Sequence, residues 1–444
     1  MGSYSNNPFQ EQANYSLLKK LLSYSLYGLL PIILVHFYVN PFSFSHTDNN
    51  FLSTNQNIIL PSPTPPSFSF SFSPPHSQEI LTKTSILQTS CDYTKGEWVK
   101  DNMGPLYNGT TCDTIKPGQN CIVFGRPDKD YLHWKWKPKQ CRLPRFSPKT
   151  FLSLLKNKHI AFVGDSLARN QLESLLCMLS TASKKHLYYT DGEDNKFRKW
   201  RFPSYNINVS IYWSPFLVKG IEKTPEQNFN TLFLDSVDEK WAKDLMDMDM
   251  LVLSVGHWYL HPAVYYYGNS VLGCHYRENC TETGFYDVFR KALKTTFERV
   301  VKACNGNAIA VFLTTFSPAH FEGEWDKLGA CSKTQPYKEN EMILEGMNEE
   351  MRKIGVEGVE EAKMRAGNSG NCVKFEVLDI TKLALLRPDG HPGPYMNPLP
   401  FANGVFERVQ NDCVHWCLPG PIDSWNEILL DVIKRWDEES KGRR

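Results

Sequence analysis

The sequence lacks an excess of charge of either sign, because 49 lysines and arginines stand against 48 aspartates and glutamates in 444 residues. It has no basic block interleaved with exposed aromatic residues, so nothing in it indicates a nucleic-acid partner. It also lacks a Rossmann-type glycine fingerprint, a P-loop and any internal repeat, so a phosphate-bearing cofactor has no recognisable binding motif. A chain of this length can form one large domain or two of ordinary size.

The first 90 residues contain no cysteine, and no lysine or arginine occurs between Lys20 and Lys83. Residues 16–39 are mostly apolar and long enough to cross a bilayer as a helix, although a proline weakens the span. Because Lys19 and Lys20 precede this stretch, the positive-inside rule predicts a cytosolic tail (1–15), a transmembrane signal anchor and a lumenal remainder. No A-x-A-like cleavage site follows, so a retained anchor is favoured over a removed signal peptide or a buried core helix.

Residues 40–90 are rich in Ser, Pro, Asn and Phe and carry almost no charge, which predicts a disordered lumenal stem. The folded lumenal domain is therefore expected at 91–440. All 12 cysteines fall between Cys91 and Cys417, and an even number in an oxidising compartment predicts disulfides. Three glycosylation sequons lie on the same side, beginning at Asn108, Asn208 and Asn279.

Short apolar runs alternate with amphipathic helical patterns through most of this domain. The strand-like runs are 160–163, 250–258, 308–316 and 373–380, and the later helical patterns are 285–304, 340–365 and 424–439. This alternation predicts an α/β fold with a mostly parallel sheet that helices flank on both faces. The cysteine-rich block 91–141 has few clear strands or helices and is expected to wrap onto the sheet. Sites in such folds form beyond the carboxyl ends of the strands.

One of these strand ends carries a serine. The segment KHIAFVGDSLARNQLESLLCML, residues 158–179, passes from an apolar strand through Gly164 and Asp165 to Ser166 and then to leucines at helical spacing. A serine at such a turn can be a nucleophile or a helix N-cap, and we expect it to be both. The G-x-S-x-G elbow of α/β-hydrolases is not met, since Ala168 replaces its second glycine.

A serine nucleophile needs a base, and the base needs an orienting partner. Near the C-terminus, DCVHWCLPGPIDSW places Asp412 and His415 three residues apart, which puts both side chains on one face of a turn. Asp412 would accept from one ring nitrogen of His415, and the other nitrogen would face Ser166. A second Asp-x-x-His pair, Asp130 and His133, precedes the serine strand, so the later pair is favoured.

A metal site is the alternative for this segment, with Cys413, His415 and Cys417 as ligands. The residue types suit zinc, but C-x-H-x-C is not a usual spacing and no second tight ligand pair is evident. Disulfide cysteines are therefore favoured, and no metal is predicted.

The motifs GDSLARNQLESLLC and DCVHWCLPGPIDSWNEILL resemble those of the plant trichome-birefringence-like proteins, a membrane-anchored branch of the GDSL/SGNH esterases. The resemblance begins at CDYTKGEWVKDNMGPLYNGTTC, continues through GRPDKDYLHWKWKPKQCRLPRF and ends near Trp436. It implies an SGNH/GDSL-like fold and O-acetylation of cell-wall polysaccharides in the Golgi lumen by a single-pass type II membrane protein. GEDNKFRKW and SVGHWYLHPAVYY are most similar to xyloglucan O-acetyltransferases, which acetylate galactosyl side chains; mannan and xylan are the alternative acceptors.

Ser166, His415 and Asp412 match the triad of this family, whose proposed mechanism is a double displacement through an acetyl-serine. The G-x-N-D asparagine of many SGNH enzymes is replaced by GHWY at 256–259, so His257 or Asn170 would supply the missing oxyanion donor. The N–H of Ser166 is the first such donor, and Arg169 matches the family's GDS-x-x-RN pattern. The residues expected to bind the oxyanion or the substrate are Gly164, Asp165, Arg169, Asn170, Gly256, His257 and Trp258.

The resemblance also implies disulfides Cys91–Cys141, Cys112–Cys177, Cys121–Cys417 and Cys331–Cys413. It leaves Cys274, Cys280, Cys304 and Cys372 unassigned, although the first two are close enough to pair locally. No cofactor is predicted, but an acetyl donor is required, and a donor-supplying membrane protein is a plausible partner. An acetylesterase with the same triad and a non-catalytic glycan-binding protein remain the alternative functions.

Overall fold

The computed structural model of the chain describes residues 91–192, 196–304, 308–367, 372–405 and 407–442. All of them belong to one unit, Ile86–Arg444. The predicted tail, signal anchor and stem (1–90) lie outside the described residues. Among the helices of the described ranges, none combines the length and the apolar character that a membrane crossing requires.

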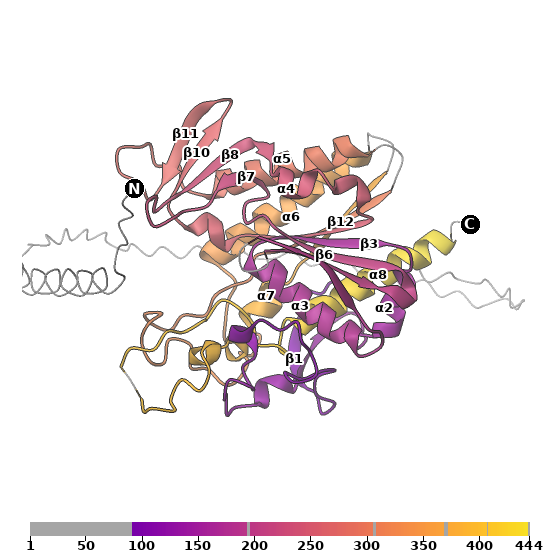
Figure 1. The fold of residues 1–444 in the computed structure, drawn as a ribbon, viewed down its shortest axis with the longest axis vertical. Helices are drawn as coiled ribbons and strands as arrows, with labels where there is room; N and C mark the ends of the chain where they lie inside the picture. Colours follow the sequence, from indigo (N-terminus) through magenta and orange to yellow (C-terminus); the bar gives the residue numbers. More distant parts are fainter. Residues whose placement is uncertain (1–90, 193–195, 305–307, 368–371, 406, 443–444) are drawn as a thin grey trace, which may run out of the picture. The chain divides into compact units, whose positions relative to one another are not determined.

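A seven-stranded sheet in the order β13-β12-β9-β3-β6-β5-β4 forms the centre of the fold (Figure 1). Its five parallel strands are β13 (Val373–Leu378), β12 (Ile309–Thr314), β9 (Met250–Ser254), β3 (His159–Gly164) and β6 (Ile207–Trp213). The strands β5 (Phe197–Phe202) and β4 (His186–Asp191) continue it in antiparallel fashion. All six residues of β3 are buried, as is typical of a central parallel strand. The prediction of a mostly parallel α/β sheet is confirmed.

Helices cover both faces of this sheet because its strands are apolar on both sides. Ile160 and Phe162 of β3 pack into one core, and Ala161 and Val163 pack into the other. The first core contains α2 (Pro148–Leu154), α3 (Ser166–Ser180) and α8 (Asp423–Gly442); the second contains α4 (Glu239–Ala242), α5 (Tyr286–Ala303) and α6 (Gly346–Gly367) (Figure 1). The prediction for α6 was wrong at its start, since the helix begins at Gly346 instead of residue 340.

A second sheet was not predicted from the sequence. It has the order β11-β10-β8-β7, with β11 (Ser270–His275), β10 (Ala263–Tyr267), β8 (Asn230–Val237) and β7 (Val218–Ile221). The cysteine-rich block contains a two-stranded antiparallel sheet of β1 (Gly96–Lys100) and β2 (Trp134–Pro138). As expected, the block packs onto the main body. Trp98 Nε1 donates at 2.9 Å to the carbonyl of Leu383, a residue of α7 (Thr381–Leu385).

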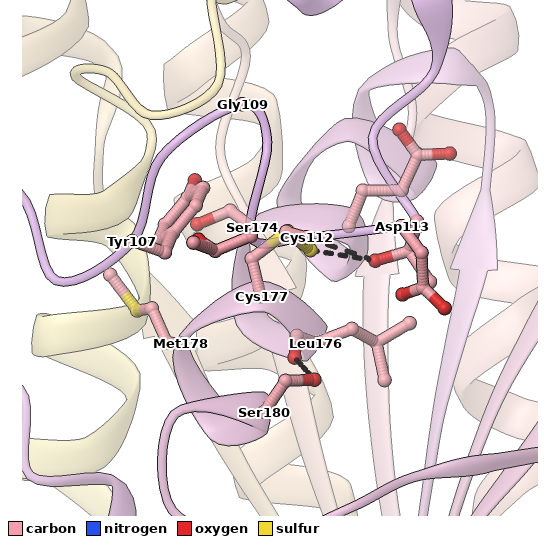
Figure 2. The surroundings of a disulfide bond; sticks show 12 residues. Tyr107, Gly109, Cys112, Asp113, Ser174, Leu176, Cys177, Met178 and Ser180 are labelled. Atoms are coloured by element: carbon pink, nitrogen blue, oxygen red, sulfur yellow. Dashed lines mark hydrogen bonds between the residues drawn. A yellow bond between two sulfur atoms is a disulfide. The ribbon is translucent and has the colours of Figure 1, made fainter.

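The twelve cysteines form six disulfides. Four of them are the pairs that the family resemblance implies, namely Cys91–Cys141, Cys112–Cys177, Cys121–Cys417 and Cys331–Cys413. The other two are Cys274–Cys280, a local pair, and Cys304–Cys372. Figure 2 shows how Cys112–Cys177 fastens the loop that carries Tyr107 and Gly109 to α3. The cysteine-rich block is therefore bonded to the helix that begins at Ser166.

Candidate active site

The turn between β3 and α3 presents Ser166 at the carboxyl edge of the sheet. Gly164 is required there, because its φ is +157° and an added Cβ would lie 1.9 Å from the Ser254 carbonyl oxygen. The N–H of Asp165 donates to that same oxygen at 3.1 Å, which ties the turn to the end of β9. Ser166 itself is partly exposed.

The expectation that Ser166 caps the helix was wrong. The N-cap is Asp165, whose Oδ1 accepts from the N–H of Leu167 at 2.9 Å, and Ser166 is the first residue inside α3. A carboxylate is the stronger partner for the electropositive end of a helix, so the aspartate takes this position and the serine hydroxyl is not used as the cap. Burial raises the pKa of Asp165 to about 6, although the Leu167 N–H acts in the opposite direction.

Asp412 and His415 lie together in the segment before α8. Nδ1 of His415 is 2.7 Å from Oδ2 of Asp412, while Oδ1 of Asp412 accepts from the N–H groups of Val414 at 3.0 Å and His415 at 2.9 Å. About a quarter of the His415 side chain is exposed, but its Nε2 is buried and has no hydrogen-bond partner among the described residues. The carboxylate therefore orients the ring and leaves Nε2 for another group.

The electrostatics of this pair suit a general base. Burial opposes a charge on His415, but the Asp412 carboxylate outweighs it and raises the pKa of His415. Burial would also raise the pKa of Asp412, but the charge and hydrogen bonds of His415 hold it well below its ordinary value. Arg169 lies near enough for its charge to oppose protonation of His415. Asp412 thus stays ionised while the imidazole exchanges a proton.

Asn170 fastens this loop to the serine helix. Its Oδ1 accepts from the N–H of Trp416 at 2.8 Å, and its Nδ2 donates to the Trp416 carbonyl at 3.2 Å. The side chain is fully buried. One N–H of Nδ2 is thus used by the residue that follows His415, and the expectation that Asn170 donates to an oxyanion stays a prediction for the other N–H.

His257 is equally committed. Its Nε2 lies 2.8 Å from the Ser317 carbonyl, which can only accept, so this nitrogen carries the proton of the neutral ring. Burial lowers the pKa of His257 to about 4, and the ring stacks on Phe316 at 4.7 Å. In this tautomer the neutral ring has no second N–H, and the expectation of an oxyanion donor from His257 stays a prediction. Neighbouring Gly256 admits this packing, since a Cβ there would lie 2.5 Å from the Phe316 ring.

The other expected residues cluster around Trp213, which sequence reasoning missed. Trp213 ends β6 directly opposite Gly164, and the partly exposed Trp258 packs against it edge-on at 5.6 Å. The buried guanidinium of Arg169 lies 5.6 Å from the Trp213 ring centre. The position of Trp213 at the end of an apolar run is the one signal in the sequence that could have found it.

The two rival interpretations of the sequence find no geometry to support them. Oδ2 of Asp130 accepts from Gln335 at 3.2 Å, and the bond that joins this pair within the described ranges is a main-chain one, from the His133 N–H to the Asp130 carbonyl at 3.1 Å, so the carboxylate does not orient the ring. Cys413 and Cys417, the alternative metal ligands, are each bonded to another cysteine.

Comparison with known proteins identifies the family of the chain. Residues 143–432 match the model of PC-esterase, described as a GDSL/SGNH-like acyl-esterase family found in Pmr5 and Cas1p. The chain belongs to the PC-esterase family. Residues 89–142 match the PMR5 N-terminal domain, so the cysteine-rich block of this PC-esterase corresponds to a domain with its own family model.

Its relatives include named enzymes. The chain is 60% identical to xyloglucan O-acetyltransferase 1 of Populus trichocarpa over 99% of both chains. It is 53% identical to xyloglucan O-acetyltransferase 1 of Arabidopsis thaliana over 96% of this chain and 99% of the relative. It is 42% identical to the Arabidopsis protein trichome birefringence-like 26 over 80% of each chain. The resemblance to the trichome-birefringence-like proteins is confirmed.

Proposed function

We propose that this PC-esterase is a xyloglucan O-acetyltransferase that acetylates galactosyl hydroxyls with Ser166 as nucleophile, His415 as general base and Asp412 as its orienting partner. The observation that carries the proposal is the 60% identity with a xyloglucan O-acetyltransferase over 99% of both chains. The bond between Asp412 and His415, and the unpartnered Nε2, support the catalytic roles.

In the first half-reaction, Nε2 of His415 takes the proton of the Ser166 hydroxyl as Oγ bonds to the acetyl carbonyl carbon of the donor. The tetrahedral intermediate collapses when the bond to the leaving group breaks, and His415 returns the proton to that group. Ser166 then holds the acetyl group as an ester.

In the second half-reaction, the sugar hydroxyl gives its proton to His415 and its oxygen bonds to the acetyl carbon. The bond to Oγ breaks, and His415 returns the proton to Ser166. Both intermediates carry a negative oxygen that needs hydrogen-bond donors. The main-chain N–H of Ser166 suits this role because the first N–H groups of a helix have no acceptor within it, and the nearby charge of Arg169 favours the same oxygen.

We further propose that the enzyme is a type II protein of the Golgi membrane, anchored by residues 16–39, with its catalytic domain in the lumen. Six disulfides in the described part of the chain suit an oxidising compartment. The acetyl donor would then reach the lumenal site from a membrane partner.

An acetylesterase is the second candidate, since the family description names acyl-esterases and the triad chemistry is the same for water as acceptor. To separate the two functions, the full-length protein in detergent would receive p-nitrophenyl acetate as the acetyl donor. Xyloglucan, mannan and xylan oligosaccharides would be added as acceptors in three separate reactions. Mass spectrometry would record acetylated sugar, and a pH-stat would record free acetate.

Acetylated xyloglucan from the wild type but not from Ser166→Ala is the expected result. If only mannan or xylan is acetylated, the protein is an acetyltransferase for that glycan and not for xyloglucan. If free acetate forms and no sugar is acetylated, the protein is an acetylesterase and not a transferase.

A further inference from the structure

His391 lies behind the segment that carries the Asp412–His415 pair. It is 4% exposed, and its ring stacks on Trp416 with centroids 4.2 Å apart and planes 26° apart. Its Nδ1 is 2.7 Å from the main-chain carbonyl oxygen of His415. No sequence motif pointed to His391, and the mechanism proposed above gives it no role.

The segment that contains His391 also bonds to Asp412, through Gly393. The main-chain N–H of Gly393 donates to the Asp412 carbonyl at 2.9 Å, and the Asp412 N–H donates to the Gly393 carbonyl at 3.0 Å. Both members of the pair are therefore held at their main chains: Gly393 bonds to Asp412 at the start of the turn, and the His391 ring contacts His415 at its end.

A second buried histidine supports His391. Nδ1 of His320 lies 2.7 Å from Nε2 of His391, and Nε2 of His320 lies 2.9 Å from the Leu385 carbonyl. The N–H of His320 donates to the Cys413 carbonyl at 3.0 Å. A line of contacts thus runs from Leu385 through both rings to His415.

The main-chain contact of His391 needs a proton on its ring. Burial lowers the pKa of both histidines, so each ring is neutral and carries one N–H. Because a carbonyl oxygen only accepts, the 2.7 Å contact with the His415 carbonyl is a hydrogen bond when that N–H is on Nδ1 of His391. The charged groups around the two rings are Asp389, Glu322, Asp412 and Arg126.

We propose that His391 is a positioning residue for His415, and that it donates from Nδ1 to the main-chain carbonyl of His415. His391 thereby holds this carbonyl, and His320 contacts the opposite nitrogen of the His391 ring. The proposal rests on the assigned base but not on the acetyl donor or the acceptor sugar.

The test compares the rate at which a fluorophosphonate labels Ser166 in the full-length protein, since this reaction needs the serine and its base but no sugar. His391→Asn places an amide N–H where Nδ1 lies, whereas His391→Leu removes the donor. The matched control is His159→Leu, which removes another buried histidine bonded to a main-chain carbonyl, at the amino end of β3. All rates are taken well below each variant's unfolding temperature.

We expect roughly tenfold slower labelling for His391→Leu and a rate within about threefold of wild type for His391→Asn and His159→Leu. In His391→Leu the pH midpoint of labelling should also fall, because a loosened loop weakens the contact by which Asp412 raises the pKa of His415. A His391→Leu protein with the wild-type rate and midpoint would overturn the proposal. If it does not fold, His320→Leu is read in its place, and a wild-type rate and midpoint there would overturn the proposal equally.

A second measurement does not depend on reactivity. Two-bond ¹H–¹⁵N spectra of ¹⁵N-histidine-labelled protein, assigned with the variants, should show the Nδ1–H tautomer for His391. An Nε2–H tautomer of His391 would overturn the proposal. A wild type that is labelled at Ser166 but acetylates no glycan would defeat the proposed function and leave this inference intact.

Discussion

Ser166 and His415 reach the site on segments of opposite construction. The serine segment is a buried strand, a tight turn and a long helix, held by regular main-chain hydrogen bonds and apolar packing. The histidine segment, 412–417, is neither helix nor strand, and individual bonds from distant parts of the chain hold it. They include two disulfides, the amide of Asn170, the ring of His391 and the main chain of Gly393. We therefore expect the serine segment to tolerate the loss of a single partner better than the histidine segment does.

The largest effect should come from removing the reacting groups, and here the two segments should behave alike. Ser166→Ala and His415→Ala should each lower acetyl transfer by about 10³-fold or more, and the double variant should be no worse than either, because the two residues act as a unit. Unfolding temperatures should stay near wild type. Additive losses in the double variant would contradict a shared step.

Breaking a disulfide should separate the segments. The paired change Cys121→Ser with Cys417→Ser should cost about 3 kcal/mol of unfolding free energy and should also lower activity at least tenfold, because His415 is two residues from the bond. The matched control is Cys304→Ser with Cys372→Ser, which should cost stability but leave kcat unchanged. Equal activities in the two proteins after correction for the unfolded fraction would refute the assigned role of the loop bond.

Asn170→Ala tests the joint between the segments. It leaves two buried main-chain groups of Trp416 without partners, so we expect a loss of about 1–3 kcal/mol and a kcat about tenfold lower. Asn426→Ala is the matched control: this buried asparagine makes three hydrogen bonds to the same helix, two with Gln171 and one with Ser174. It should lose similar stability with much less effect on kcat.

The pH dependence of activity should report the histidine segment alone. His415 acts as a base only when neutral, and its pKa is raised, so kcat should rise with pH through a midpoint above about 6.5. Asp412→Asn should lower both that midpoint and kcat, since it removes the carboxylate that raises the pKa. A midpoint unchanged in Asp412→Asn would assign the ionisation to another group.

The smallest effect on activity is expected from changes beside the serine helix, more than two turns from Ser166. Ser174 and Tyr107 lie beside the Cys112–Cys177 disulfide (Figure 2), and both donate to Asp423. Burial raises the pKa of Asp423 to about 6 and that of Glu427 to about 7, and both carboxyls line a cavity of about 60 Å³.

A carboxyl whose folded pKa is raised stabilises the fold below its unfolded pKa and loses that contribution as pH rises. The contribution of these two carboxyls to the free energy of unfolding should therefore fall by about 4 kcal/mol between roughly pH 4.5 and 7, and Glu427→Gln should remove about half of that fall relative to wild type. Chemical denaturation at a series of pH values would measure it, and an equal slope in both proteins would exclude Glu427.

The same contrast explains how much of the molecule was predictable. The strands β3, β9, β12 and β13 and the helix α3 follow from apolar periodicity, which is a local signal. The Asp412–His415 pair was found because its residues are three apart. The roles of Asn170 and His391 were not found, since their bonds join residues 246 and 24 positions apart and no local pattern marks them. The four-stranded sheet was missed although β10 (AVYYY) is a continuous apolar run, because the other three strands mix polar residues or glycine into short sequences.

The bond between Cys121 and Cys417 has a consequence for when the protein becomes an enzyme. It joins residues 296 positions apart, with the second near the end of the chain. Because a chain is made from its N-terminus, the proposed nucleophile is synthesised well before the proposed base and before the cysteine that fastens the loop of that base. We therefore expect a copy in which Cys121–Cys417 has not formed to be less active than the oxidised protein, so that oxidation of this bond would couple maturation to activity.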